Sequence, residues 1–199
     1  MRIMIKMGLL VAALGSAAQV RAQGPVFAGT GRVFEAGIGY TYMQSDVPSL
    51  GKVPMTGVLL SVSEDLNPHF GVKVQAGYSR SFDAFQTGHS ADVLTYMAGP
   101  TLYAVRRSKF DIHAQLLVGG ARETGVNFEN GGTLVRGYVN HAAWAGGAGV
   151  QFRVRRGVTL RPEVEYLSTS FFNSSVAIQR HTNLRASLSM IYTFGAGRE

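Results

Sequence analysis

The chain has 199 residues, of which 46% are hydrophobic and 16% are charged, and its formal net charge is +7. It contains no cysteine, which excludes disulfide bonds, thiolate metal sites and a lipoprotein-type lipid anchor. Two basic clusters, at residues 106–109 and 153–156, lie between strand-like segments without interleaved aromatic residues, which argues against a nucleic-acid-binding protein. We interpret them as solvated turns, and the functional alternative that they favour is a contact with anionic lipid headgroups.

The beginning of the chain has the pattern of a secretory signal peptide. Arg2 and Lys6 are followed by an apolar stretch over residues 7–18, and Val20 and Ala22 offer small side chains where a signal peptidase reads them. The apolar stretch is too short to span a bilayer as a helix, and no later segment offers about 20 consecutive apolar residues. We therefore expect a signal peptide at residues 1–22, a linker at 23–32, a β-barrel at 33–194 and a short periplasmic tail at 195–199.

Eight segments after the linker alternate apolar residues with small or polar ones, which is the period of two of a β-strand. In the third segment, for example, Val72 and Val74 share one face while Lys73 and Gln75 point to the other. The segments span residues 34–42, 54–63, 70–79, 94–103, 112–119, 144–152, 158–167 and 183–194.

The face opposite the apolar residues consists mostly of small side chains. A water-facing surface would carry many Lys and Glu residues, whereas the interior of a narrow barrel has room mainly for Gly, Ser, Thr and a few paired charges. The sequence therefore predicts an all-β fold, namely an eight-stranded antiparallel up-and-down transmembrane β-barrel.

The connections between the segments alternate in length. The short ones are residues 65–69, 106–109 and 153–157, and the longer ones are residues 44–52, 81–91, 122–139 and 168–182. Short turns on the periplasmic side and long loops outside the cell are typical of outer-membrane barrels. We therefore expect the outer membrane of a Gram-negative-type bacterium, with both termini periplasmic.

Aromatic residues fall at both ends of the predicted strands, where girdles at the membrane interfaces are expected. At the long-loop ends these are Tyr40, Tyr42, Tyr78, Trp144 and Tyr166, and at the short-turn ends Phe34, Phe70, Phe152, Tyr192 and Phe194. Pro100 and Pro162 interrupt two of the strands, and because proline donates no ladder hydrogen bond we expect local bulges near them.

Three stretches, at residues 94–100, 161–167 and 185–194, carry a family resemblance. Through them the chain resembles the small eight-stranded outer-membrane β-barrel family, of the outer-membrane protein A transmembrane-domain and OmpX type. The resemblance implies insertion by the outer-membrane assembly machinery, which reads a last strand ending in alternating aromatic residues. Tyr192 and Phe194 match this signal, although Met190 stands where a glycine is usual.

Six charged residues face the interior of the predicted barrel. By strand position, four lie in the periplasmic half and two in the outer half, and they are Glu35, Lys73, Arg161 and Glu163, then Glu165 and Arg185. Unpaired buried charges are costly, so mixed signs at similar depth predict ion pairs, among them one between Glu165 and Arg185. We interpret the six as a structural charge network that plugs the lumen, rather than a gated polar path, and we expect no general pore.

The sequence predicts no catalytic residue, no cofactor and no metal ligand. The function that we expect is an envelope structural component or a surface-loop interaction and adhesion module. One alternative is a lipid A-modifying enzyme at the outer rim using Ser168 or Ser187 with His181, although residues 181–183 lack the His-x-Ser arrangement of the deacylase; another is a soluble periplasmic lipocalin-like barrel. Expected partners are outer-membrane lipids and lipopolysaccharide, the assembly machinery and an extracellular ligand of the loops. We expect no nucleic-acid partner, and we expect the protein to be a monomer.

Overall fold

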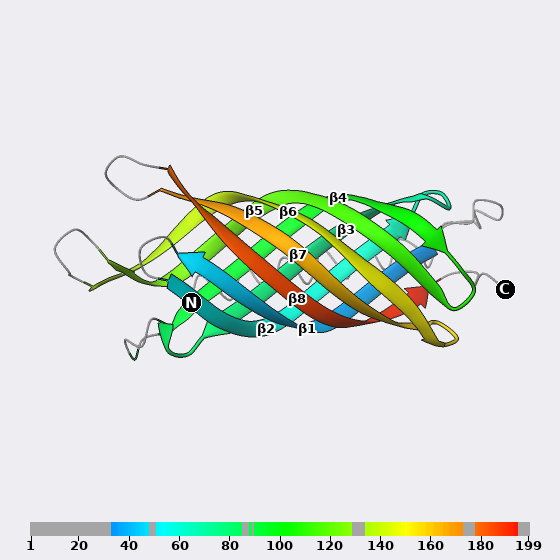
Figure 1. The fold of residues 1–199 in the computed structure, drawn as a ribbon, viewed down its shortest axis with the longest axis horizontal. Helices are drawn as coiled ribbons and strands as arrows, with labels where there is room; N and C mark the ends of the chain where they lie inside the picture. The colour runs from blue at the N-terminus through cyan, green and yellow to red at the C-terminus, as the bar shows by residue number, and fades with distance from the viewer. Residues whose placement is uncertain are drawn as a thin grey trace, which may run out of the picture. The chain divides into compact units, whose positions relative to one another are not determined.

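The computed structural model describes residues 33–47, 51–84, 88, 90–128, 134–172 and 178–194. These residues form eight antiparallel strands that close into a barrel, as Figure 1 shows. The strands are β1 (Val33–Val47), β2 (Gly51–Asp65), β3 (Phe70–Ser81), β4 (Ala91–Arg106), β5 (Phe110–Phe128), β6 (Leu134–Arg155), β7 (Val158–Phe172) and β8 (Ile178–Phe194). The predicted fold class is confirmed. The signal peptide, the linker and the tail that the sequence predicts lie outside the described residues, and within these ranges no helix is long and apolar enough to cross a membrane.

Each strand pairs with its neighbours in the sequence, and the ring closes where β8 pairs with β1. This pairing runs from Phe34 opposite Phe194 to Asp46 opposite Thr182, and Figure 1 shows the red β8 beside the blue β1. A closed ring leaves no unpaired strand edge inside the membrane, where no water is present to satisfy backbone N–H and C=O groups.

The two faces of the strands differ as the alternation predicts. On β3, Val74 points outward and is 54% exposed, whereas its neighbour Gln75 points into the barrel and is 1% exposed. The exposed outer surface is rich in aliphatic and aromatic side chains, including Ile38, Leu60 and Val118. An outer surface of this kind requires a hydrocarbon environment.

Exposed aromatic side chains mark the two ends of this apolar surface. Tyr40, Tyr42, Tyr78, Trp144 and Tyr166 lie towards the end with the long connections, and Phe152, Tyr192 and Phe194 lie towards the other end. At that other end, Phe34 and Phe70 are half-buried.

Three connections that we expected to be long loops are instead largely strand. The pairing of β5 with β6 continues to Phe128 opposite Leu134, and that of β7 with β8 continues to Phe172 opposite Ile178. The pairing of β1 with β2 continues to Val47 opposite Gly51. Once a hairpin has formed, each added pair gains backbone hydrogen bonds with no further cost of loop closure, so Gly- and Asn-rich composition did not end these strands.

Pro100 and Pro162 are accommodated by missing ladder pairs, whereas Pro54 of β2 is paired with Gln44 of β1. At Pro100 the ladder with β5 is interrupted, and at Pro162 the ladder with β6 is interrupted, but the register is the same before and after each proline. The register shifts lie elsewhere, at Tyr103–Val105 and at Arg153–Arg155. The predicted bulges near the prolines are thus present a few residues away, and at the prolines themselves the omitted pairs account for the missing N–H donor.

The interior contains an apolar core towards the end with the long connections. Its larger members are Met43, Met55, Met97, Leu117 and Leu167, each at most 3% exposed. Small side chains complete it, including Ala121 and Ala145, and so does Ala84 from the segment after β3. The interior of this half of the barrel is thus filled by closely packed apolar side chains, as in the core of a soluble protein. The sequence had predicted an interior of mostly small and polar residues.

Candidate functional site

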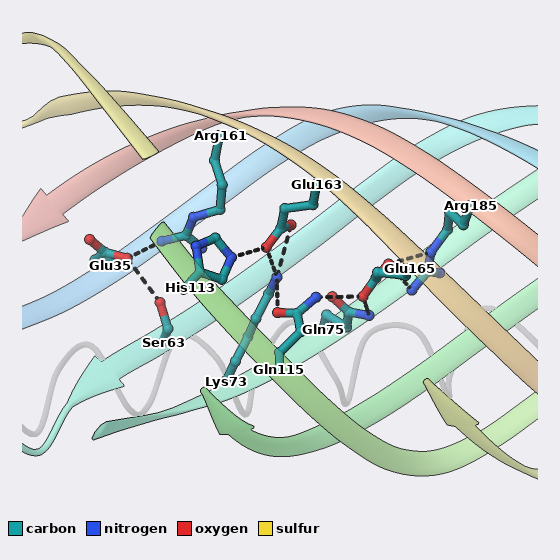
Figure 2. A network of polar contacts seen from close by, with 10 residues as sticks. All are labelled: Glu35, Ser63, Lys73, Gln75, His113, Gln115, Arg161, Glu163, Glu165 and Arg185. Carbon is teal, nitrogen blue, oxygen red and sulfur yellow. Dashed lines mark hydrogen bonds and ion pairs between the residues drawn. The ribbon is translucent and has the colours of Figure 1, made fainter. Parts of the chain in front are cut away.

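The six charged residues predicted for the lumen all lie inside the barrel and are buried. Nearest the short-turn end, the Arg161 guanidinium from β7 forms an ion pair with the Glu35 carboxylate from β1. The same carboxylate oxygen accepts a hydrogen bond from Ser63 Oγ on β2 at 3.1 Å, as Figure 2 shows. Glu35 therefore holds together three strands, β7, β1 and β2, which are not all neighbours in the ring.

A second group of contacts surrounds Lys73 on β3. Lys73 Nζ lies 2.7 Å from Glu163 Oε1 and 2.9 Å from Glu163 Oε2, and it donates to Gln115 Oε1 at 3.0 Å. His113 Nε2 lies 2.9 Å from Glu163 Oε1. Because β3 and β7 are on opposite sides of the ring, this ion pair crosses the lumen.

A third group is centred on Glu165, on the side of Glu163 away from the short turns. Arg185 Nε on β8 donates to Glu165 Oε2 at 2.7 Å, and Arg185 Nη1 donates to Thr95 Oγ1 on β4 at 3.1 Å. Glu165 Oε1 accepts from Gln75 Nε2 at 2.9 Å and from Gln115 Nε2 at 2.7 Å. The Gln115 amide thus links the Lys73 group to the Glu165 group (Figure 2).

The glycines of β6 make room for the two buried carboxylates. Gly149 is paired with Glu163, and Gly147 is paired with Glu165. A Cβ atom on either glycine would lie 2.7 Å from the Cγ atom of its paired glutamate. This separation is shorter than van der Waals contact, so these positions favour glycine because the Glu side chains cross them.

The charges of the network are balanced. Three cations, Lys73, Arg161 and Arg185, meet three carboxylates. Among the described residues no cluster of His, Asp and Glu fits a metal ion. Ser187 of the rim-enzyme alternative is buried in the lumen opposite Glu163, Ser168 is buried opposite Trp144, and the side chain of His181 lies outside the described residues.

Comparison with known proteins identifies the family. Residues 7–194 match the family model of the outer membrane protein beta-barrel domain. The chain belongs to this family. The predicted resemblance to small outer-membrane barrels is confirmed, and the soluble lipocalin-like alternative is excluded. No curated protein sequence matches the chain.

Solved structures with the same fold include three small barrels. Neisserial surface protein A has a TM-score of 0.66 at 13% identity, covering 81% of this chain and 97% of that one. Ail, the attachment invasion locus protein of Yersinia pestis, has a TM-score of 0.58 at 16% identity, with coverages of 81% and 98%. OprG from Pseudomonas aeruginosa has a TM-score of 0.52 at 14% identity, with coverages of 84% and 97%. At these identities the likeness establishes the shared outer-membrane β-barrel fold.

The sequence predicted that the six charged residues of this outer-membrane barrel lie in its lumen. It did not predict which polar residues connect them. Gln75, His113 and Gln115 each contact a network carboxylate, and all three have the inward parity that the alternation assigns. Their positions along the strands could have identified them, since each lies at the same level of the barrel as one of the charged residues. Parity alone gives no partner across the lumen, because that depends on the tilt and stagger of the strands.

Proposed function

We propose that this family member is a monomeric envelope barrel with a closed lumen that contacts extracellular partners through strand extensions beyond the membrane. In this proposal the short turns and both chain termini face the periplasm, the long hairpins face outwards, and the lipids and lipopolysaccharide of the outer membrane surround the apolar wall. The single observation that supports the contact role is the length of the β5–β6 hairpin.

The β5–β6 hairpin extends well beyond the closed ring. Pairing of β6 with β7 begins only at Ala143 opposite Thr169, whereas pairing of β6 with β5 continues to Phe128 opposite Leu134. Among the residues that the structure describes, the β7-facing backbone edge of β6 therefore has no strand partner over residues 134–140. An edge of this kind suits the addition of an extended peptide from another protein, which would use main-chain hydrogen bonds for affinity.

The closed lumen in this proposal is supported by the interior contacts. The charged groups join β1, β3, β5, β7 and β8 across the barrel, and the apolar core fills the half beyond them. Eight strands enclose little more than their own side chains. We therefore expect no passage of sugars through the barrel, which swelling of protein-containing liposomes in arabinose would measure.

The last strand supports recognition by the assembly machinery. Tyr192 and Phe194 are both exposed on the outer surface of β8, with their ring centroids 4.7 Å apart, and the Phe194 ring lies 6.1 Å from that of Phe34. We propose these two residues as the assembly signal. Replacing both with serine should lower the amount of inserted barrel in cells.

The contact role is tested by shortening the hairpin. Residues 125–137 are replaced with Asn-Gly, which forms a two-residue turn between the paired residues Thr124 and Tyr138. Bacteria that express this variant should adhere to epithelial cell monolayers about tenfold less than bacteria with the unaltered barrel.

The matched control shortens the β7–β8 hairpin. Residues 170–180 are replaced with Asn-Gly between Thr169 and His181, which are also paired. This variant should keep its adhesion. Unchanged adhesion of the β5–β6 variant, at equal amounts of inserted barrel, would contradict the proposed contact surface.

A further inference from the structure

The short-turn mouth of the barrel contains a cavity with unbalanced positive charge. The cavity has a volume of about 840 Å³. Three carboxylates line it, and each is already paired with an arginine. Asp65 lies 2.7 Å from Arg106, Asp111 lies 2.6 Å from Arg153, and Glu35 is paired with Arg161.

Two further arginines line the same cavity without a carboxylate. Arg155, the last residue of β6, and Arg156, in the turn that follows, are exposed, and among the described residues neither forms an ion pair. In addition, Arg106 Nε and Nη2 are buried without a hydrogen-bond partner among the described residues. The mouth therefore offers donors and positive charge to an anionic group, and guanidinium groups suit phosphate in particular.

An apolar groove adjoins this cavity on the outer wall of the barrel. It has a volume of about 320 Å³ and is lined by Ala36, Ile38, Val158 and Met190, together with Tyr192. Tyr192 lines the groove and the cavity at the same time. The small side chain of Ala36, directly opposite Tyr192 in the β1–β8 ladder, leaves the wall hollow at this point.

A second apolar feature lies beside the two arginines. Val154, between Arg153 and Arg155 at the register shift of β6, is 68% exposed. An apolar side chain at a charged turn is expected where the turn meets the boundary between headgroups and hydrocarbon. The charged cavity and the apolar groove are thus contiguous at the level of that boundary.

We propose that this face of the barrel binds one phospholipid with an anionic headgroup. Its phosphate is held at the cavity by Arg155 and Arg156, and one acyl chain lies in the groove beside Ala36 and Tyr192. A free phosphate would use only the first of these features, whereas a lipid uses both. In the orientation proposed above, the lipid belongs to the periplasmic leaflet.

The headgroup part is tested by native mass spectrometry of the delipidated barrel in detergent. The probes are phosphatidylglycerol and phosphatidylethanolamine with the same acyl chains. The unaltered protein should retain phosphatidylglycerol at least about fivefold better, and R155Q/R156Q should lower its affinity by roughly 20-fold, since each arginine near a lipid surface contributes about fivefold. The control R107Q/K109Q removes the same charge from the neighbouring turn, outside the cavity, and should change retention little.

The acyl-chain part is tested by filling the groove. A36F should lower phosphatidylglycerol retention about tenfold, while A114F, at an outward-facing alanine on β5, should not. All variants should keep the boiling-dependent migration of a folded barrel. Equal retention of the two lipids by the unaltered protein, or retention that R155Q/R156Q leaves unchanged, overturns the proposal. Competition by glycerol phosphate as strong as that by the lipid, with no effect of A36F, shows a phosphate site only and also overturns it.

Discussion

Glu165 shows how a single buried carboxylate is satisfied in this barrel. It accepts hydrogen bonds from Gln75 and Gln115 through one oxygen and from Arg185 through the other. Glu165 and Arg185 are each 1% exposed. If one of the two charges is removed, the other stays buried without a counter-ion, which is costly in free energy. If both are removed, no unpaired charge stays buried.

Arg185→Ala alone should therefore destabilise the barrel more than the double change with Glu165→Ala. We expect the single variant to lose about 3–5 kcal/mol of unfolding free energy, because it leaves the Glu165 charge with amide donors only. Urea unfolding of protein refolded in lipid vesicles measures this. The control pair, Arg185→Ala with Glu35→Ala, joins residues of separate groups and should be additive; strict additivity of the Arg185 and Glu165 changes would show that they do not interact.

Gly149 and Gly146 give a second comparison of single residues on one strand. Gly149→Ala would bring a Cβ atom to 2.7 Å from Glu163 Cγ and 2.8 Å from the Pro162 carbonyl oxygen, whereas a Cβ on Gly146 meets only Trp144 at 3.7 Å. The first substitution should cost about 1–3 kcal/mol through overpacking. The second should change stability by less than about 1 kcal/mol. The same urea titration tests both, and equal effects would contradict the close passage of Glu163 across β6.

At the scale of the elements, the alternation along each strand fixes which side chains meet lipid. A shift of one residue would exchange the two faces of a strand, so substitutions at neighbouring positions report the register directly. On β3 the outward position Val74 is flanked by Lys73 and Gln75, which both contact glutamates across the lumen.

Val74→Arg should destabilise the barrel in a bilayer by about 2–4 kcal/mol, the cost of a charge near the midplane on the lipid face. Leu66→Arg, in the short turn before β3, should cost about 0–1 kcal/mol because the charge reaches water. Gln75→Ser should cost less than Val74→Arg, since it removes one hydrogen bond to Glu165. The reverse order of Val74 and Gln75 would show that the register of β3 is off by one.

The elements also show what the sequence could and could not predict. The period of two assigned the inward and outward faces of all eight strands, because a buried face leaves a direct trace in the sequence. The extensions of β5 and β6 were missed, because pairing beyond the membrane needs no apolar pattern. Ion pairs among the lumen charges were predicted, but the individual partners across the lumen, such as Lys73 and Glu163, were not, since they lie on strands that are not adjacent.

At the scale of the whole molecule, closure of the ring is the main source of the barrel's resistance to unfolding. Every strand has two partners, and the interior is held by charge pairs at one end and by an apolar core at the other. Within the closed ring, unfolding therefore has no free edge at which to begin, and separate parts of the ring are expected to open together.

The protein should accordingly migrate at different apparent masses in SDS before and after boiling, and it should resist extraction from membranes by carbonate. Both results follow from a closed hydrogen-bonded ring with an apolar outer wall. Gel electrophoresis of isolated outer membranes measures the first, and fractionation measures the second. Release of the protein by carbonate, or identical migration before and after boiling, would be incompatible with this architecture.

The pairing of Phe34 with Phe194 places the beginning of β1 beside the end of β8, on the same side of the ring. A short linker between them, with new ends opened between β4 and β5, would give a circularly permuted chain that keeps the pairing of β8 with β1. In that chain, Tyr192 and Phe194 would no longer stand on the final strand. Such a permutant would separate the interactions that keep the barrel folded from the assembly signal that we propose for Tyr192 and Phe194.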